Sequence, residues 1–101
     1  MKITCSVDDR IATVRLEGEL DHHAAGEVID RAEALIDGCF PLELIFDMSA
    51  VSFMDSSGIA VVLGSYRRMR AVGGSVRLTG IPRQSEKVLL AAGIDKILKI
   101  S

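Results

Sequence analysis

The chain has 101 residues, a formal net charge of -2, 49% hydrophobic residues and 26% charged residues. This length and balance fit one globular domain with a single core, so we expect residues 1–101 to form one domain. The charge excludes the basic stripe of a nucleic-acid-binding protein, and an aromatic fraction of 4% excludes a base-stacking platform. No apolar run reaches the roughly 18 residues of a membrane span, and no signal core opens the sequence. We therefore expect a cytoplasmic protein whose partners are neither nucleic acid nor membrane.

Neither the cysteines nor the histidines form a pattern that is typical of a metal or cofactor site. Cys5 and Cys39 lie far apart with apolar neighbours, so we interpret both as small core residues in a reducing compartment. His22 and His23 are adjacent, and neighbouring residues on a helix point about 100° apart, so they do not easily share a ligand. We expect no metal and no cofactor, and a surface or interface role for the histidines.

In the first half of the chain, the spacing of the apolar residues changes twice. Alternating apolar residues at 3–7 and 12–18 predict two strands that a tight turn at residues 8–10 joins into an antiparallel hairpin. A helical apolar stripe follows, with Asp21 as its predicted N-cap and Gly38 as its predicted stop. The nearly continuous apolar run at 42–48 predicts a strand that is covered on both faces.

The second half repeats this alternation of strands and helices. A short anchored loop after residue 48 leads to a helix at 56–71, which Gly73 and Gly74 end. A strand is predicted around residues 76–81, then a helix with Pro82 in its first turn, and a last strand at 97–100. The order β-β-α-β-α-β-α-β predicts an α/β fold. Its sheet is mixed but mostly parallel, with four to five strands, an N-terminal β-hairpin and helices packed against it.

The segment Asp55-Ser56-Ser57-Gly58 is the most informative stretch, because it lies between a predicted hydrophobic strand and an amphipathic helix. A serine at that place can cap the helix, act as a nucleophile or accept a phosphate, and all three remain open. The free N–H groups and the dipole of a helix start tolerate an anion. A phosphate there, which adds about -1.5 to -2 units of charge, would leave the fold intact but disfavour a docked partner.

Two other aspartates are expected near this junction. Asp21 and Asp47 follow or end predicted strands, so both are expected at the same sheet edge as Asp55. That edge, beyond the carboxyl ends of parallel strands, is where open α/β sheets usually place function. The alternatives are that Asp21 only caps a helix and that Asp47 is a carboxylate satisfied by N–H groups of its loop.

The predicted exposed side of the second helix presents small apolar residues before a basic end. Ala60, Val61 and Gly64 form a smooth surface suited to a partner, unless neighbouring helices cover some of them. The arginines at positions 67, 68 and 70 are interpreted as a solvated helix end that is favourable to the dipole.

Two motifs together resemble a known family. Residues 18–24, Gly-Glu-Leu-Asp-His-His-Ala, and residues 53–58, Phe-Met-Asp-Ser-Ser-Gly, resemble the bacterial anti-sigma factor antagonists, which are single STAS domains. The likeness is greatest to the antagonists of the sporulation anti-sigma-F system and covers nearly the whole chain. It implies a STAS-like fold and partner switching without catalysis by this chain. The unphosphorylated antagonist binds an anti-sigma factor that is also a serine kinase, and it frees the sigma factor.

The resemblance also implies roles for individual residues. The kinase would phosphorylate Ser56, with Ser57 less favoured, and a PP2C-type phosphatase would reset the cycle. The residues expected to contact the partner are Asp21, His22, Asp55, Ser57, Gly58, Ala60, Val61 and Gly64.

Two other functions stay open beside this one. A nucleotide- or ligand-binding STAS module of a sensing assembly is the first, although the chain lacks a Gly-x-Gly-x-x-Gly or Walker motif. The second is a small hydrolase that pairs Ser56 or Ser57 with His22 or His23, although no Gly-x-Ser-x-Gly elbow is present.

Overall fold

A tight antiparallel hairpin begins the fold of residues 1–100, the part of the chain that the computed structural model describes. Strand β1 (Lys2–Asp8) pairs with β2 (Ile11–Leu20) along its whole length. Asp9 and Arg10 between them have φ angles of 49° and 65°, the left-handed values of a two-residue hairpin turn whose twist matches the strands. The predicted hairpin and its turn are confirmed.

The remaining elements alternate as the sequence predicts, with one short addition. They are α1 (His22–Cys39), β3 (Glu43–Met54), α2 (Ser56–Ala71), β4 (Ser75–Thr79), α3 (Arg83–Ala91), the 3-10 helix η1 (Ile94–Lys96) and β5 (Lys99–Ile100). The five strands lie in the order β1-β2-β3-β4-β5, and every pair after the first is parallel. This confirms the mixed, mostly parallel sheet with an N-terminal hairpin, while η1 was not predicted.

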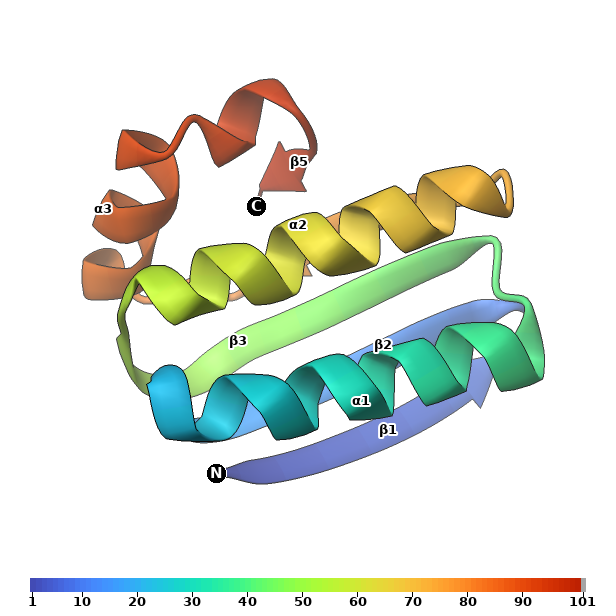
Figure 1. The fold of residues 1–101 in the computed structure, drawn as a ribbon, viewed down its shortest axis with the longest axis horizontal. Helices are drawn as coiled ribbons and strands as arrows, with labels where there is room; N and C mark the ends of the chain where they lie inside the picture. The colour runs from blue at the N-terminus through green and yellow to red at the C-terminus, as the bar shows by residue number, and fades with distance from the viewer. Residues whose placement is uncertain (101) are drawn as a thin grey trace.

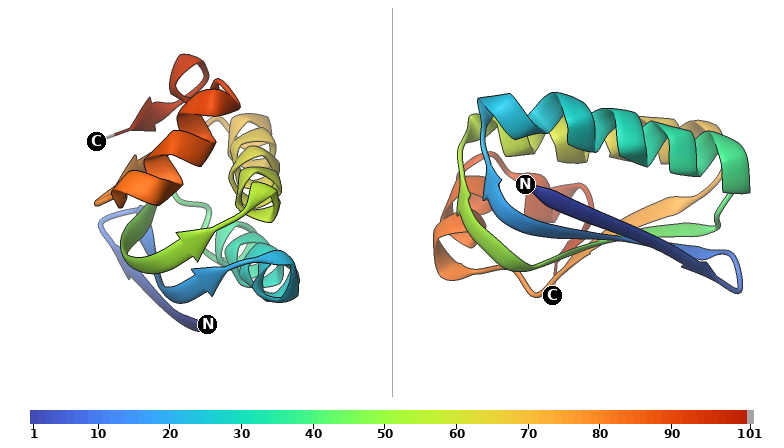
Figure 2. Two further views of the ribbon diagram at one scale, coloured as in Figure 1. Left: turned by 90° about the vertical axis from the view of Figure 1, so that its left-hand side faces the viewer. Right: turned by 90° about the horizontal axis from the view of Figure 1, so that it is seen from below.

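The core lies between the sheet and two long helices on one of its faces. Figures 1 and 2 show α1 and α2 side by side over that face, while α3 lies at one end of the sheet. Leu44, Phe46 and Met48 of β3 point into this core and are fully buried. None of the helices in residues 1–100 has both the length and the apolar composition needed to cross a membrane.

The other face of the sheet is open, so the prediction that residues 42–48 are covered on both faces is wrong. Glu43, Ile45 and Asp47 alternate with the buried residues of β3 and are only half-buried. Two of these side chains are charged and find partners on the open face: Glu43 pairs with Arg77, and Asp47 pairs with Arg15. Cross-strand ion pairs therefore replace a second helical layer over β3.

Strand β3 also runs six residues past the predicted end at residue 48, to Met54. Its register with β2 shifts twice, between Arg15 and Glu17 and between Gly18 and Glu19. Bulges of this kind break the two-residue alternation of side chains. The buried residues of this half of β3 are therefore three apart, at 48, 51 and 54, which is why the sequence predicted a loop.

The ends of the other elements differ from prediction by one or two residues. Helix α1 continues past Gly38 to Cys39, and Phe40 ends it with a φ of 47° and an N–H that donates to the Ile36 carbonyl. Pro41 follows, and the residue before a proline is disfavoured in helical conformation. Pro82 is the N-cap of α3 rather than part of its first turn, and β4 stops at Thr79.

The two cysteines do not both lie in the core. Cys5 is half-buried, whereas Cys39 is exposed at the end of α1, and both thiols are free. The prediction for Cys39 is wrong because it falls on the last helical residue, outside the buried stripe of Ala25, Val28, Ala32 and Ile36.

Candidate functional site at the serine junction

Helices α1 and α2 start next to each other at the carboxyl ends of β2 and β3. The last residues of these strands, Leu20 and Met54, are paired, and the Asp55 N–H donates to the Leu20 carbonyl at 3.3 Å. Figure 1 shows both helices starting at the same end of the sheet, beside α3. The Asp21 and Asp55 junctions therefore form one edge of the molecule, as predicted.

Each of these helices is capped by an aspartate in the same conformation. Asp21 has φ -110° and ψ -173°, and Asp55 has φ -107° and ψ -170°. The Oδ1 of Asp21 accepts the N–H groups of His23 and Ala24 at 3.0 Å, and that of Asp55 accepts the N–H of Ser57 at 2.8 Å. Since the residue before Ser56 already caps α2, the alternative that a serine caps this helix is wrong.

Ser56 is the first residue of α2 and is exposed, while Ser57 is half-buried. Within the described residues, no side chain or backbone group makes a hydrogen bond to the Ser56 hydroxyl. This hydroxyl is therefore accessible from solvent. It lies at the positive end of a helix of 16 residues, where a negative charge is favoured.

The predicted partner surface on α2 is only partly exposed. Ala60 and Gly64 are exposed, but Val61 is fully buried, so its predicted place on the outer face is wrong. The buried stripe runs through small residues, including Gly58 and Ser65. The buried face of α2 is thus not the face that its large apolar side chains indicate, and Val61 lies on it.

Gly58 lets α2 approach the strands closely, and it is buried rather than presented to a partner. A Cβ at this position would lie 2.6 Å from Cγ and 2.9 Å from Sδ of Met54, and 3.2 Å from Cδ2 of Leu20. Real Cβ contacts essentially never fall below 3.0 Å. The glycine thus sets how the start of α2 sits on the ends of both strands.

Asp47 lies away from this edge, and its predicted place there is wrong because β3 continues to Met54. It is paired opposite Thr79 and Arg15 within the sheet. Its carboxylate accepts the Ser49 hydroxyl at 2.7 Å, the Ser49 N–H at 3.0 Å and Arg15 Nη1 at 3.0 Å. The bonds from Ser49 are the main reason that the pKa of Asp47 lies below its usual value. The alternative interpretation of Asp47, as a carboxylate that accepts a hydrogen bond from a nearby backbone N–H, is confirmed.

His22 and His23 are exposed at the start of α1, with ring centroids 5.8 Å apart in an edge-to-face arrangement. No group of three or more His, Cys, Asp or Glu side chains in residues 1–100 could hold a metal ion. No hydrogen bond joins either histidine to Ser56 or Ser57 in the described part of the chain.

An acidic hollow of about 330 Å³ opens beside the start of α1, and the sequence analysis missed it. Its lining consists of Met1, Glu19, Asp21, His23, Ala24 and Glu27. Glu19 precedes Asp21 by two residues at the end of β2, and Glu27 follows His23 by one helical turn. The sequence does contain a signal for this hollow: the spacing of Glu19 from Asp21 and of Glu27 from His23 places both glutamates on the same side of the start of α1.

Two of the three arginines at the far end of α2, Arg68 and Arg70, have side-chain partners. Arg68 forms hydrogen bonds and an ion pair with Asp37 of α1, which lower the pKa of Asp37 and raise that of Arg68. Arg70 donates to the Tyr66 hydroxyl at 2.9 Å. Arg68 is nevertheless 40% exposed, as predicted for a solvated helix end, and its ion pair with Asp37 is a surface contact between α2 and α1.

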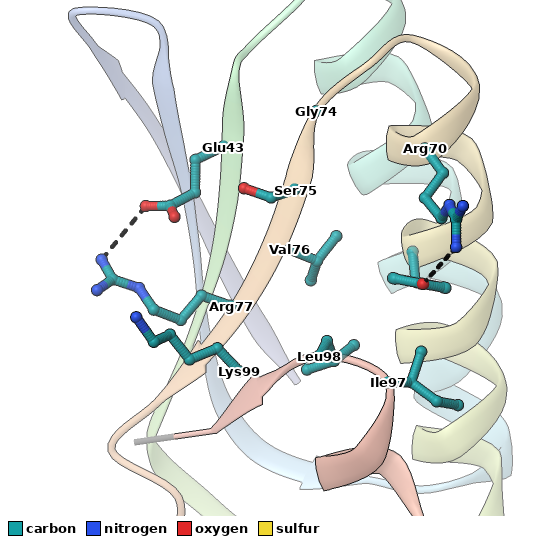
Figure 3. Close-up of a pocket in the computed structure, with 10 residues that line it drawn as sticks. Glu43, Arg70, Gly74, Ser75, Val76, Arg77, Ile97, Leu98 and Lys99 are labelled. Carbon is teal, nitrogen blue, oxygen red and sulfur yellow. Dashed lines mark hydrogen bonds and ion pairs between the residues drawn. The ribbon is translucent and has the colours of Figure 1, made fainter.

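A larger hollow of about 460 Å³ lies at that same end, away from Ser56 (Figure 3). Arg70, Arg77 and Lys99 line it together with apolar residues of β4 and the segment before β5. Figure 3 shows that Glu43 and Arg77 point toward one another, and their side chains pair at 3.3 Å.

Comparison with known proteins identifies the fold family and its relatives. The model of the STAS domain family matches residues 2–101. The anti-sigma F factor antagonist of Lysinibacillus sphaericus is 37% identical over 81 residues, which are 80% of this chain and 69% of that protein. The anti-sigma F factor antagonist of Paenibacillus polymyxa is 31% identical over 90 residues, 89% of this chain and 77% of that protein.

Two solved structures of one relative match almost the whole chain. The anti-sigma factor antagonist SpoIIAA in its unphosphorylated form has a TM-score of 0.87 at 30% identity, covering 99% of this chain and 88% of that chain. SpoIIAA from Bacillus in the phosphorylated form has a TM-score of 0.77 at 30% identity, covering 99% of this chain and 91% of that chain.

Proposed function

The chain belongs to the STAS domain family and to its anti-sigma factor antagonists, and from this premise we propose a phosphorylation switch. With Ser56 unmodified, the protein binds an anti-sigma factor that is also a serine kinase, and the sigma factor is freed. The kinase then transfers a phosphoryl group from ATP to Ser56, which releases the antagonist. A PP2C-type phosphatase removes the phosphate and resets the cycle.

One observation carries this proposal: Ser56 is exposed at the start of α2 while Asp55 already caps the helix. The hydroxyl can therefore be modified without the loss of a structural hydrogen bond. The helix dipole tolerates the added anion. The existence of SpoIIAA structures in both the unphosphorylated and the phosphorylated form supports a switch that keeps the fold.

The acidic surroundings of Ser56 explain why a phosphate would evict a partner. Asp21 and Asp55 lie at the same edge, and Glu19 and Glu27 are exposed near Asp21. In water, the phosphate and these carboxylates are solvated. A docked partner would remove that water and leave a dianion close to like charges, which is costly.

The contact surface that we propose comprises exposed and half-buried residues around the two helix starts. It contains Asp21, His22, Asp55, Ser57, Ala60 and Gly64. Gly58 contributes by setting the position of α2, and Val61 belongs to the core. The relatives are named for anti-sigma F, and the setting that we propose for this chain is a sporulation pathway in the cytoplasm.

The direct test is to incubate the protein with the anti-sigma factor of the same organism and ATP, and to map the modified residue by mass spectrometry. We expect one phosphate per chain, on Ser56. Ser57→Ala is the matched control and should still be modified, whereas Ser56→Ala should bind the anti-sigma factor and resist release. A stoichiometric phosphate on another residue would remove Ser56 from this role.

The hollow at the far end of α2 favours a second candidate, a nucleotide- or ligand-binding module of a sensing assembly. Arg77 and Lys99 lie together on one side of β4, whereas Arg70 lies on α2 on the other side (Figure 3), so the cations that could face the phosphate of a ligand together are Arg77 and Lys99. Calorimetry with ATP and GTP tests this function, with Lys99→Ala as the variant that should lose binding. If neither nucleotide gives a heat of binding, the second candidate is excluded and the antagonist function is the one that remains.

A further inference from the structure

The end of β3 that leads to Ser56 lacks a neighbouring strand on one side. β4 pairs with β3 only as far as Asp47 opposite Thr79. Gly80 follows with a φ of 65° and takes the chain out of the sheet, and a Cβ there would lie 2.9 Å from that of Ser49. On its other side, β3 stays paired with β2 up to Leu20 opposite Met54. Residues 48–54 therefore form an overhang.

A glutamine from α3 takes the place of the missing strand at the last residue of this overhang. The Oε1 of Gln84 accepts the Met54 N–H at 2.9 Å, and its Nε2 donates to the Met54 carbonyl at 2.8 Å. This is the pair of bonds that a parallel strand would make to one residue. At neutral pH a carboxamide offers a donor and an acceptor side by side without charge, which an ionised carboxylate does not.

Met54 links this clamp to the start of α2. The next residue, Asp55, donates to the Leu20 carbonyl and caps the helix through Ser57. The Met54 side chain is fully buried beneath Gly58. The backbone before Ser56 is thus held by Leu20 on one side and by Gln84 on the other.

We propose that Gln84 is a positioning residue for Ser56: it fixes the Met54 backbone, and thereby the cap and the serine, for the incoming kinase. This role rests on the proposed function. In this role, α3 contributes to the switch through the Met54 backbone and does not contact the transferred phosphate. Gln84 itself lies at the surface, so the clamp does not arise from burial in the core.

The test uses Gln84→Glu in the full chain, with Arg83→Gln as the matched control. Both substitutions change the charge of the first turn of α3 by the same amount, and Arg83 is exposed. When ionised, the glutamate cannot donate to the Met54 carbonyl, and its second oxygen would face that carbonyl oxygen where Nε2 now donates at 2.8 Å. We expect the repulsion between these two oxygens to displace the side chain, so that the bond to the Met54 N–H is lost as well. At neutral pH we expect hydrogen-exchange protection of the Met54 amide to fall at least tenfold, with the Phe46 amide unchanged.

Acid should rescue the variant, which a merely structural disturbance would not do. As the pH falls toward the usual glutamate pKa of about 4.3, the carboxyl gains a proton that it can donate. The protection ratio between Gln84→Glu and the unsubstituted protein should then approach one. Gln84→Ala can make neither bond, so unchanged protection of Met54 in that variant at neutral pH would overturn the clamp.

Phosphorylation kinetics connect the clamp to the serine. With the anti-sigma factor of the same organism and ATP, we expect kcat/KM for Ser56 to fall at least fivefold in Gln84→Glu and to stay unchanged in Arg83→Gln. Loss of Met54 protection with unchanged kcat/KM would refute the positioning role and leave the proposed function intact. If the unsubstituted protein is not phosphorylated on Ser56, the proposed function itself fails.

Discussion

The junctions from β2 to α1 and from β3 to α2 have the same backbone and different chemistry. In each, an aspartate with nearly the same φ and ψ follows a buried strand residue and caps a long helix. After the cap come two histidines in α1 and two serines in α2. The scaffold therefore presents two equivalent helix starts, and only the second offers a hydroxyl that can be esterified.

The two junctions also differ in how they are held. The third residue after the cap is Ala24 in α1 and Gly58 in α2, and only the glycine lies on Met54 with no room for a Cβ. Of these two strand ends, only Met54 has a carboxamide clamp among the described hydrogen bonds. The start of α2 thus has two constraints that the start of α1 lacks.

The largest effect is expected from Gly58→Val, which removes that close approach. Even its Cβ would lie within 3 Å of Met54 side-chain atoms, so the strand end or the helix must shift. Such overpacking costs about 2–3 kcal/mol of unfolding free energy. Urea denaturation measures this cost, with Gly64→Ala as the control. Nothing lies within 4 Å of a Cβ at Gly64, so that change should stabilise the helix by up to about 1 kcal/mol. An unchanged free energy of unfolding in Gly58→Val would show that the junction is not tightly fixed.

Next in size is the effect of a charge placed on one helix start only. Ser56→Asp should weaken the complex with the anti-sigma factor at least tenfold, about 1.4 kcal/mol, because the carboxylate must be desolvated beside Asp55 and Asp21. Far-ultraviolet circular dichroism should stay unchanged, since a helix start tolerates an anion. His22→Asp puts the same charge at the equivalent position of α1 and should weaken the complex less. Equal losses would mean that the two junctions serve the partner alike.

These local contrasts also explain which features the sequence could predict. Periodicity predicted every helix and strand except η1, and the pattern around Asp21 predicted a real cap. The serine junction was found because its polar residues stand between two strongly apolar elements. The overhang of β3 was missed because its bulges space the buried residues three apart. The place of Val61 was missed because small residues, Gly58 and Ser65, share its buried face.

The Gln84 clamp could not be predicted from any local pattern. Its partner is 30 residues away in the sequence, and a glutamine in the first turn of a helix is ordinary. The Met54 N–H and carbonyl are available to Gln84 because β4 leaves the sheet at Gly80 and does not pair with the end of β3. The same holds for Asp47, whose place depends on how far β3 continues.

The smallest expected difference is between the two caps themselves. Replacing an N-cap aspartate by alanine costs about 0.5–2 kcal/mol. Asp21 accepts two N–H groups and Asp55 accepts one, so Asp21→Ala should lie nearer the upper end and Asp55→Ala nearer the lower end. Urea denaturation of both variants measures this, and Asp→Asn at each position should recover most of the loss, because asparagine caps about as well. A larger cost for Asp55→Ala would mean that the serine junction depends on its cap more than the hydrogen bonds alone indicate. The cap would then act together with Gly58 and the Met54 clamp in holding the start of α2.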